Sequence, residues 1–381
     1  MPDSIKHRVY LIPGFFGFAN LGELVYFGPV KTFLEAEIRR RGLDADIITV
    51  PSHPTASVRT RALDLLDTLE ATAGESGPLH FIGHSTGGLD ARLLLTPAVD
   101  LGGGRSPAAF ANRTQTLVTV ATPHYGTPLA SFFNSFFGSK MLEVLSLFTV
   151  YVLRFGRVPL PLLFRIAGTM LRLDRKLGWK DTVLDQLFDE LLSNFSEDRR
   201  HALSAFFDDV RKDRSLVPQL TPENMDLFNP GVTDRVGVKY GSVVTRALAP
   251  SPASFFKIGL GPYTQVSHAV YAFLYGRAAM FPLDRAPPPT AAQAQVLVRG
   301  LGSLMPLTAN DGIVPTRSQV HGQVLRAVKA DHLDVIGHFD GPDDRPPHVD
   351  WLFSGSAFKH NDFVSVWSDI ADFCLGRVSG P

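Results

Sequence analysis

Ser85 carries the clearest signal of chemistry in the sequence. The stretch LHFIGHSTGG places this serine after a short apolar segment and before a segment with helical spacing. Such a turn projects the hydroxyl at the start of a helix, where backbone N–H groups and the helix dipole favour developing negative charge. Gly83 and Gly87 are small enough for neighbouring backbone to approach closely. We therefore predict that Ser85 is a nucleophile; the alternative is an ordinary tight turn between a strand and a helix.

A nucleophilic serine also needs two backbone N–H groups to bind the oxyanion that forms when it attacks a carbonyl. One donor is expected from Thr86, which directly follows the nucleophile. The other is expected from the loop after the first predicted strand, residues 13–17, where Phe15 is the better candidate. The alternative is that this glycine-containing loop only ends the strand.

A base and its orienting acid should follow in the chain order serine, acid, histidine. Asp311 stands in an Asn-Asp-Gly turn, and His332 comes just after a predicted strand. The histidine would take the proton from Ser85 and donate it to the leaving group, while the aspartate would fix the histidine tautomer. Other late histidines compete for the role of base, namely His338, His348 and His360.

The surrounding segments alternate between strand and helix patterns. Apolar, β-branched runs predict strands at 7–12, 45–50, 79–82, 116–121, 236–244 and 324–328. Helical spacing is found at 56–71, 89–95 and 363–373. The Pro-rich run 286–290 is predicted to be an exposed linker or loop. This alternation favours an α/β fold with a mostly parallel sheet covered by helices on both faces.

Five motifs occur in a fixed order along the chain, namely PGFFG, GHSTGG, VATPHYGTPL, NDGIVP and DHLDVIG. In these motifs the chain resembles the bacterial triacylglycerol lipases, and most of all their thermoalkaliphilic branch. The resemblance implies an α/β-hydrolase fold and hydrolysis of carboxylic esters. It also implies a triad of Ser85, Asp311 and His332, with Phe15 and Thr86 as oxyanion donors, which agrees with the assignment made from the residues.

The resemblance bears on metals in two ways. The thermoalkaliphilic branch binds a structural zinc through a histidine-bearing insertion before the nucleophile, and this chain lacks that insertion. We therefore expect no zinc, with His53 and His80 as ordinary polar residues. The family also holds calcium just after the catalytic histidine, where Asp334 and Asp340 could supply oxygen ligands, although Asp340 is one residue out of register. The alternative is a solvated acidic loop. No other cofactor is expected.

Residues 126–233 differ from the rest, because their apolar residues follow helical spacing throughout. We predict a helical cap inserted into a core formed by 1–125 and 234–381. The apolar stretch 141–173 is interrupted by arginines and prolines, which excludes a transmembrane segment. The inner face of the cap would line an acyl pocket, and an exposed apolar face could contact a lipid surface. The alternative is that its phenylalanines only form the core of the cap.

Composition limits the partners and the compartment. Lysine plus arginine and aspartate plus glutamate both total 37, so no electrostatic signature of nucleic-acid binding is present. The single cysteine, Cys374, allows no intrachain disulfide and fits a reducing compartment. The first residues lack a signal-peptide pattern, which predicts a cytoplasmic protein if Met1 is the natural start and a secreted one if the chain was trimmed.

The predicted activity leaves alternatives open. A serine triad serves lipases and carboxylesterases, but it serves equally in thioester, lactone or polyester hydrolysis and in acyl transfer. A non-catalytic binding module on the same fold is a different class of function. Such a module is expected to have lost a triad residue, whereas all three predicted positions are occupied in this sequence.

Overall fold

The computed structural model describes residues 6–15, 26–97, 99–102, 104–172, 182–303, 305–345 and 347–376. Within them, six parallel strands form one sheet in the order β2-β1-β3-β4-β5-β6. The strands are β1 (His7–Ile12), β2 (Ala45–Thr49), β3 (Leu79–His84), β4 (Thr114–Val120), β5 (Lys239–Thr245) and β6 (Gln323–Val328). All six predicted strands are present, with bounds that shift by up to three residues.

Alternate side chains of each strand pack on opposite faces of the sheet, as a period of two requires. In β1, Val9 and Leu11 join one hydrophobic core, and Tyr10 and Ile12 join the other. The first core includes residues of α1 (Gly28–Arg41) and α15 (His360–Leu375), and the second includes residues of α2 (Val58–Thr72), α3 (Gly87–Leu95) and α4 (Ala108–Arg113). The parallel sheet is thus covered on both faces, as predicted.

Helix α14 (Ala291–Leu301) packs against β6 directly after the Pro-rich run. Sequence analysis missed this helix, although its start has a local signal. Thr290 and Gln293 form a reciprocal capping box, in which each side chain accepts a hydrogen bond from the backbone N–H of the other residue. The prolines therefore precede a helix start instead of marking only a linker.

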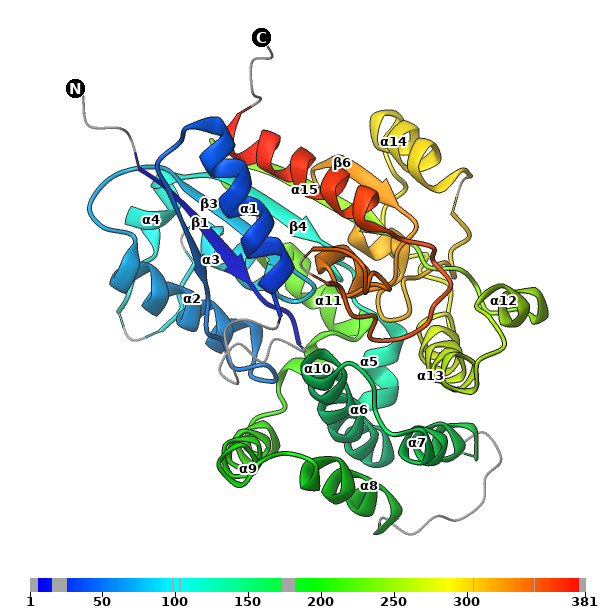
Figure 1. Ribbon diagram of the computed structural model, residues 1–381. Helices are drawn as coiled ribbons and strands as arrows, with labels where there is room; N and C mark the ends of the chain where they lie inside the picture. The colour runs from blue at the N-terminus through cyan, green and yellow to red at the C-terminus, as the bar shows by residue number, and fades with distance from the viewer. Residues whose placement is uncertain are drawn as a thin grey trace.

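Within its described residues, the segment between β4 and β5, called the cap below, has helices as its only regular structure. They are α5 (Pro128–Phe133), α6 (Phe136–Phe155), α7 (Leu160–Arg172), α8 (Thr182–Ser193), α9 (Glu197–Lys212), α10 (Leu216–Gln219), α11 (Pro222–Phe228) and the 3-10 turn η3 (Asn229–Gly231). Figure 1 shows α6 to α9 gathered on one side of the molecule, with both termini at the opposite side. The cap therefore lies at one end of the sheet.

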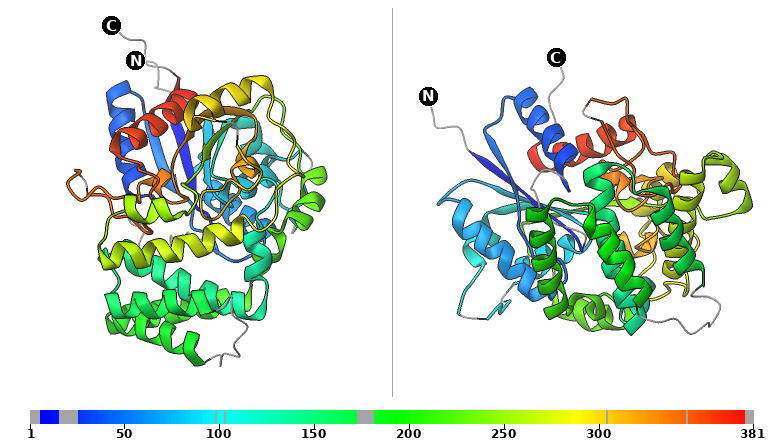
Figure 2. Two further views of the ribbon diagram at one scale, coloured as in Figure 1. Left: turned by 90° about the vertical axis from the view of Figure 1, so that its right-hand side faces the viewer. Right: turned by 60° about the horizontal axis from the view of Figure 1, so that its bottom comes forward.

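One further helix joins the cap from the later part of the chain. After α12 (Pro252–Lys257), the long helix α13 (Pro262–Ala278) packs against α7 and α5. Figure 2 shows this helix between the sheet and the cap helices. The predicted division at residue 234 assigns α13 to the core. In the structure, however, α13 packs directly against helices of the cap.

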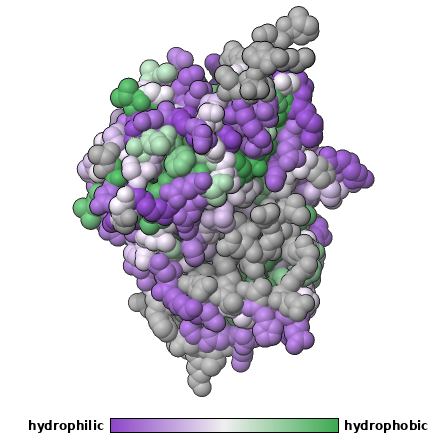
Figure 3. Space-filling model, turned by 90° about the vertical axis from the view of Figure 1, so that its left-hand side faces the viewer, coloured by the Kyte–Doolittle hydropathy of each residue, from purple (hydrophilic) through white to green (hydrophobic). Residues whose placement is uncertain are grey.

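The described residues contain no helix that is long and apolar enough to cross a membrane. On the face drawn in Figure 3, hydrophilic residues predominate among those coloured, and hydrophobic residues form small patches between them.

His80 gives the fold a testable dependence on pH. It lies on β3, is inaccessible to solvent, and its ring contacts Thr116 Oγ1 and His7 Nδ1. Burial lowers its pKa to about 3. Between an unfolded pKa of about 6.5 and that value, only the unfolded chain binds this proton, so stability falls as the pH falls. We expect His80→Phe to reduce the slope of unfolding free energy against pH by up to about 1.4 kcal/mol per pH unit between pH 6 and 4.

Denaturant unfolding of wild type and variant across this pH range measures that difference. His53→Gln is the matched control, because His53 is largely exposed and pairs with Asp64 at the surface. Parallel stability curves for wild type and His80→Phe would contradict the expectation.

Candidate active site

Ser85 stands at the carboxyl end of β3, directly before α3, in a strained backbone conformation. Its φ is 54°, in the left-handed region that residues with a side chain seldom adopt. The turn is fixed from both sides, because Ser85 N donates to the carbonyl of Val120 on β4 (2.8 Å) and Ser85 O accepts from Gly88 N (3.2 Å). The side chain lines a small cavity, and the residue is only 5% exposed.

The turn depends on positions without a side chain. A Cβ on Gly87 would lie 2.2 Å from the carbonyl oxygen of Ile12, and one on Gly83 would lie 2.4 Å from the backbone nitrogen of Gly88. Sequence analysis did not single out Gly14, where a Cβ would lie 2.5 Å from the Cβ of Ser85. The loop after β1 therefore packs directly against the predicted nucleophile.

Asp311 and His332 form a buried hydrogen-bonded pair. His332 Nδ1 lies 2.9 Å from Asp311 Oδ2, the two residues are 1% and 0% exposed, and His332 N donates to Asp311 O (3.0 Å). The other contacts of the carboxylate come from donors alone. These are Ile313 N, Val314 N, Thr245 Oγ1 and Gln319 Nε2. Since every neighbour donates, the Asp311 carboxylate also accepts a hydrogen bond from His332 Nδ1–H. With the proton on Nδ1, the lone pair of the imidazole lies on Nε2.

The structure places His332 next to the turn that carries Ser85. The rings of His84 and His332 have centroids 4.8 Å apart, and His84 Nε2 lies 2.9 Å from the carbonyl oxygen of His332. No hydrogen bond between the Ser85 hydroxyl and His332 Nε2 is formed in the part of the chain that the structure describes. In ligand-free enzymes such bonds are often long or poorly aligned and shorten only when substrate is bound.

Tyr26 and His84 form a hydrogen-bond chain that sequence analysis missed. Because His84 Nε2 faces a carbonyl, it must carry the proton, so His84 Nδ1 accepts from Tyr26 Oη (2.6 Å). Tyr26 Oη in turn accepts from Gly14 N (3.1 Å). Burial lowers the pKa of His84 well below its usual value and keeps the ring neutral. The chain therefore links the loop after β1 to the backbone of His332.

We expect Tyr26→Phe to reduce the free energy of unfolding by about 1–3 kcal/mol, because it leaves His84 Nδ1 and Gly14 N buried without partners. Thermal and denaturant unfolding measure this loss. Tyr10→Phe is the matched control, since among the described residues the hydroxyl of Tyr10 bonds only to the exposed Thr72. Equal unfolding free energies of the two variants would show that the hydrogen-bond chain from Gly14 to His332 does not contribute to stability.

The predicted oxyanion donors both lie beside Ser85. The cavity that Ser85 lines is also lined by Phe15 and Thr86, and Thr86 is the N-cap residue of α3. The backbone N–H of Thr86 donates to no carbonyl among the described residues, so it is available at the positive end of the helix. These positions suit donors for an oxygen bound above Ser85.

The loop that leads to Phe15 is anchored by a fully buried arginine. Arg61 on α2 donates through Nη2 to the carbonyl of Pro13 (2.6 Å) and through Nη1 to that of His53 (2.8 Å), and its Nε contacts Asp90 Oδ2 (2.9 Å). Burial raises the pKa of Asp90 to about 6, and the charge of Arg61 opposes this rise. Arg61 thus positions the loop without touching the cavity.

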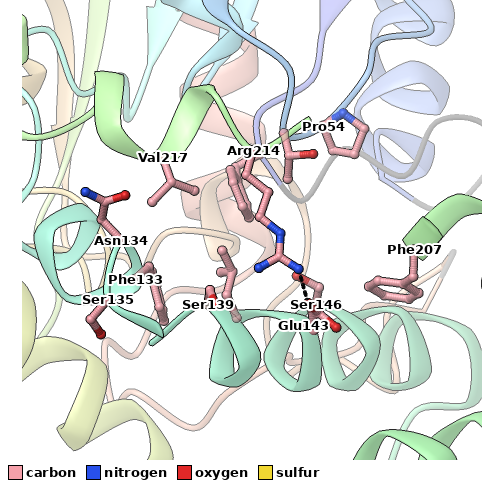
Figure 4. Close-up of a pocket in the computed structure, with 13 residues that line it drawn as sticks. Pro54, Phe133, Asn134, Ser135, Ser139, Glu143, Ser146, Phe207, Arg214 and Val217 are labelled. Carbon is pink, nitrogen blue, oxygen red and sulfur yellow. Dashed lines mark hydrogen bonds and ion pairs between the residues drawn. The ribbon is translucent and has the colours of Figure 1, made fainter. Parts of the chain in front are cut away.

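Two neighbouring cavities extend from Ser85 into the cap. The one at Ser85 has a volume of about 40 Å³, and the next one, drawn in Figure 4, has a volume of about 200 Å³. Both are lined by Phe15, Phe133, Leu142 and Val217. In Figure 4 the guanidinium of Arg214 pairs with Glu143 on α6 across the larger cavity. Apolar side chains therefore line both cavities, and the larger cavity is also lined by charged and polar side chains.

No family model matches the chain, and no curated protein matches it. Solved structures do. A metagenomic carboxyl esterase superposes with a TM-score of 0.51 at 14% identity, over 98% of this chain and 76% of that one. Lipase 1 from Pelosinus fermentans superposes with a TM-score of 0.51 at 17% identity, over 99% of this chain and 100% of that one. With the parallel sheet and the turn at Ser85, this similarity decides the fold. The chain has the α/β-hydrolase fold.

In the α/β-hydrolase fold of this chain, the site residues lie at the carboxyl ends of neighbouring parallel strands. Phe15 follows β1, Ser85 follows β3, and Thr245, the last residue of β5, contacts Asp311. Parallel strands end at the same edge of a sheet, which is where open α/β folds bind ligands. The topology thus brings together residues from distant parts of the sequence.

Three carboxylates from residues on both sides of His332 form a cluster. One oxygen each from Asp331, Asp334 and Asp350 lies within 4.8 Å of the other two. Burial raises the pKa of all three, and the charge of Asp331 adds to the effect for Asp334 and Asp350. Asp331 Oδ2 is buried and has no hydrogen-bond partner within the described ranges. Converging oxygens, one of them unsatisfied, fit a hard divalent cation.

Of the two carboxylates proposed for calcium from the sequence, Asp334 belongs to this cluster. Asp340 does not belong to it, and its Oδ2 instead lies 3.9 Å from Lys359 Nζ. Asp331 and Asp350 were missed. Asp331 stands inside the DHLDVIG motif and was the easier to find, whereas Asp350 has no local signal, because it reaches the cluster only through folding.

The three histidines that competed with His332 lie elsewhere. His338 Nε2 contacts the carbonyl of Tyr26 (2.9 Å), and burial lowers its pKa to about 4. His348 and His360 lie close to each other, with ring centroids 5.7 Å apart. None of the three contacts Asp311 within the described residues, so the buried carboxylate selects His332 alone.

Proposed function

We propose that this chain is a serine hydrolase that cleaves carboxylic esters, as lipases and carboxylesterases do. The observation that carries the proposal is the buried Asp311–His332 pair, held beside a serine whose φ is 54°. An acceptor-only carboxylate fixes the tautomer of the imidazole, and the strained turn presents the hydroxyl. The five motifs further support a relation to the bacterial triacylglycerol lipases and, within them, to the thermoalkaliphilic branch.

The proposed reaction follows from these positions. Ser85 Oγ attacks the ester carbonyl as His332 Nε2 takes its proton, and the oxyanion accepts hydrogen bonds from the backbone N–H groups of Thr86 and Phe15. His332 then donates the proton to the leaving alkoxide, which leaves an acyl group on Ser85. Water, deprotonated by the same histidine, releases the acid. Asp311 stabilises the imidazolium at both stages.

The cavities suit an apolar acyl group of limited length. The cavity at Ser85 is the smaller of the two, so a longer acyl group would have to extend past Phe133 and Leu142 into the larger cavity. The Glu143–Arg214 pair is part of the lining of that cavity, and such a charged surface would not accept an apolar chain end. We therefore propose short and medium acyl chains as the preferred substrates.

A series of p-nitrophenyl esters of increasing acyl length tests the function, together with labelling by a fluorophosphonate probe. We expect one label per chain, on Ser85, and a turnover that rises to medium chains and falls for long ones. An unlabelled protein that hydrolyses no ester of the series would refute the proposal. Labelling without ester hydrolysis would point to a thioester, a lactone or an acyl acceptor other than water.

We also propose that the cap contacts lipid surfaces. Phe155 on α6 and Phe164 on α7 are 46% and 51% exposed, and both helices belong to the cap. Activity on emulsified long-chain triglyceride, compared with a soluble short-chain ester, distinguishes a lipase from an esterase. A rate that does not increase once the substrate exceeds its solubility would count against contact with an interface.

For the acidic cluster we propose a calcium ion held by Asp331, Asp334 and Asp350. Bound calcium would supply positive charge that keeps the three carboxylates ionised and the segment after His332 ordered. We expect chelation to lower the melting temperature and added calcium, but not magnesium, to restore it. Asp350→Asn should remove the calcium response, and Asp340→Asn, outside the cluster, should keep it. A melting temperature that changes neither with chelator nor with calcium would contradict the proposal.

A further inference from the structure

A second group of side chains, away from Ser85 and distinct from the acidic cluster, combines two imidazoles with one carboxylate. We propose that Asp344, His348 and His360 bind a transition-metal ion, namely zinc. One ring nitrogen from each histidine and one oxygen of Asp344 lie within 4.8 Å of one another. Two nitrogens and one oxygen are a donor set that zinc favours and that calcium and magnesium do not.

The ring of His348 is held as a metal ligand requires. Its Nδ1 lies 2.7 Å from the carbonyl oxygen of Gly337, so Nδ1 carries the proton and Nε2 carries the lone pair. A backbone carbonyl behind a ligand histidine is the usual arrangement around zinc, because it fixes both the tautomer and the ring orientation. The residue is 3% exposed, and its ring stacks on Phe339 with centroids 4.1 Å apart. The ring is therefore fixed before any metal binds.

His360, the first residue of α15, supplies the observation that points to a ligand. Its Nδ1 is buried and has no hydrogen-bond partner among the residues that the structure describes. A buried ring nitrogen without a partner is unfavourable, and a bond to a metal would offset this cost. Within the described part of the chain no side chain or backbone group bonds to this nitrogen, although the ring lies beside that of His348.

Asp344 completes the set from a tight turn. Its backbone N–H donates to the carbonyl of Gly341 (3.2 Å), which also accepts from His348 N (2.9 Å). A Cβ on Gly341 would lie only 2.2 Å from Asp344 Oδ2, so the carboxylate packs directly on a backbone without a side chain. Two of the three side chains thus come from one closed turn, and the third comes from the start of the next helix.

The spacing is close to that of a formed site. Bonds of about 2.0–2.2 Å in a tetrahedron place ligand atoms about 3.4 Å apart, which small side-chain rotations would reach here. Three protein ligands leave one position for water. The expectation of no zinc was based on a missing insertion before Ser85, whereas this site lies after His332. Bound metal would fasten the turn 341–348 to the start of α15.

The test uses purified full-length protein stripped by chelation and then titrated with Zn²⁺. We expect one bound zinc per chain by elemental analysis, a higher melting temperature with zinc, and the visible absorption of tetrahedral Co²⁺ when cobalt replaces zinc. His360→Gln and Asp344→Asn should each weaken zinc binding at least about tenfold and abolish the shift in melting temperature. Both residues are partly exposed, so these variants should fold.

His53→Gln is the matched control, because it removes a largely exposed histidine paired with an aspartate elsewhere on the surface. It should bind zinc like the wild type. The proposal is overturned if wild type binds no zinc, or if zinc binding survives both His360→Gln and Asp344→Asn. It is equally overturned if His53→Gln loses zinc as they do, since that would indicate scattered surface binding. None of these outcomes depends on ester hydrolysis or on calcium.

Discussion

Ser85→Ala should reduce turnover of p-nitrophenyl esters by at least about 10⁴-fold, because it removes the atom that forms the acyl intermediate. Fluorophosphonate labelling should disappear with it. The fold should tolerate the change, since the hydroxyl of Ser85 makes no hydrogen bond within the described residues. Alanine would keep the backbone interactions of Ser85 with Val120 and Gly88. We therefore expect a stability within about 1 kcal/mol of wild type, so that lost activity reports chemistry and not unfolding.

Ser52→Ala is the matched control for Ser85→Ala. Ser52 is also buried, at 3% exposure, and its hydroxyl is likewise without a hydrogen-bond partner. It lines neither of the two cavities that begin at Ser85. This variant should keep wild-type turnover and labelling. If Ser85→Ala retained turnover or a stoichiometric label, the nucleophile would have to be another residue.

Local sequence patterns are enough to propose the catalytic residues, because the requirements of the turn are themselves local. Gly83 and Gly87 flank Ser85 within five residues, and the contacts of both with nearby backbone explain why glycine is needed there. Asp311 likewise sits in an Asn-Asp-Gly turn, where its own Oδ1 accepts from the backbone two and three residues later. Short-range geometry of this kind leaves a signature that a single sequence displays.

Contacts between distant segments leave no such signature. The chain from Gly14 through Tyr26 and His84 to His332 joins three separate parts of the sequence. Nothing in the residue spacing marks Tyr26 as a partner, because only the parallel sheet brings β1 and β3 side by side. Helix α13 shows the same limit, since sequence analysis predicted neither this helix nor its packing against α5 and α7.

The acidic residues show how a motif can be interpreted only in part. The motif DHLDVIG indicates Asp334 as a possible ligand. The carboxylates that cluster with Asp334 are those of Asp331 and Asp350, and not that of Asp340. Asp350 lies well beyond the motif, and Trp351 beside it donates to Asp331 Oδ1 (2.8 Å). The folded loop, and not the register of the motif, therefore determines which oxygens converge.

Asp311→Asn should also reduce turnover strongly, by about 10³–10⁴-fold, through the tautomer of His332. The amide must place its NH₂ group either toward Ile313 N and Val314 N or toward Thr245 Oγ1 and His332 Nδ1. Each choice sets donor against donor, because every neighbour of this carboxylate donates. The conflict is relieved when His332 moves its proton to Nε2, where it can no longer accept the proton of Ser85.

The chain provides a close control in its second aspartate–histidine pair. Asp234 Oδ1 lies 3.1 Å from His321 Nε2, and this pair lines neither cavity at Ser85. Asp234→Asn should therefore keep turnover within a few-fold of wild type. Fluorophosphonate should label Asp311→Asn much more slowly than Asp234→Asn, at a temperature where both are folded. Equal labelling rates would mean that Asp311 contributes only to stability, and the base would then have to be sought among groups that do not contact it.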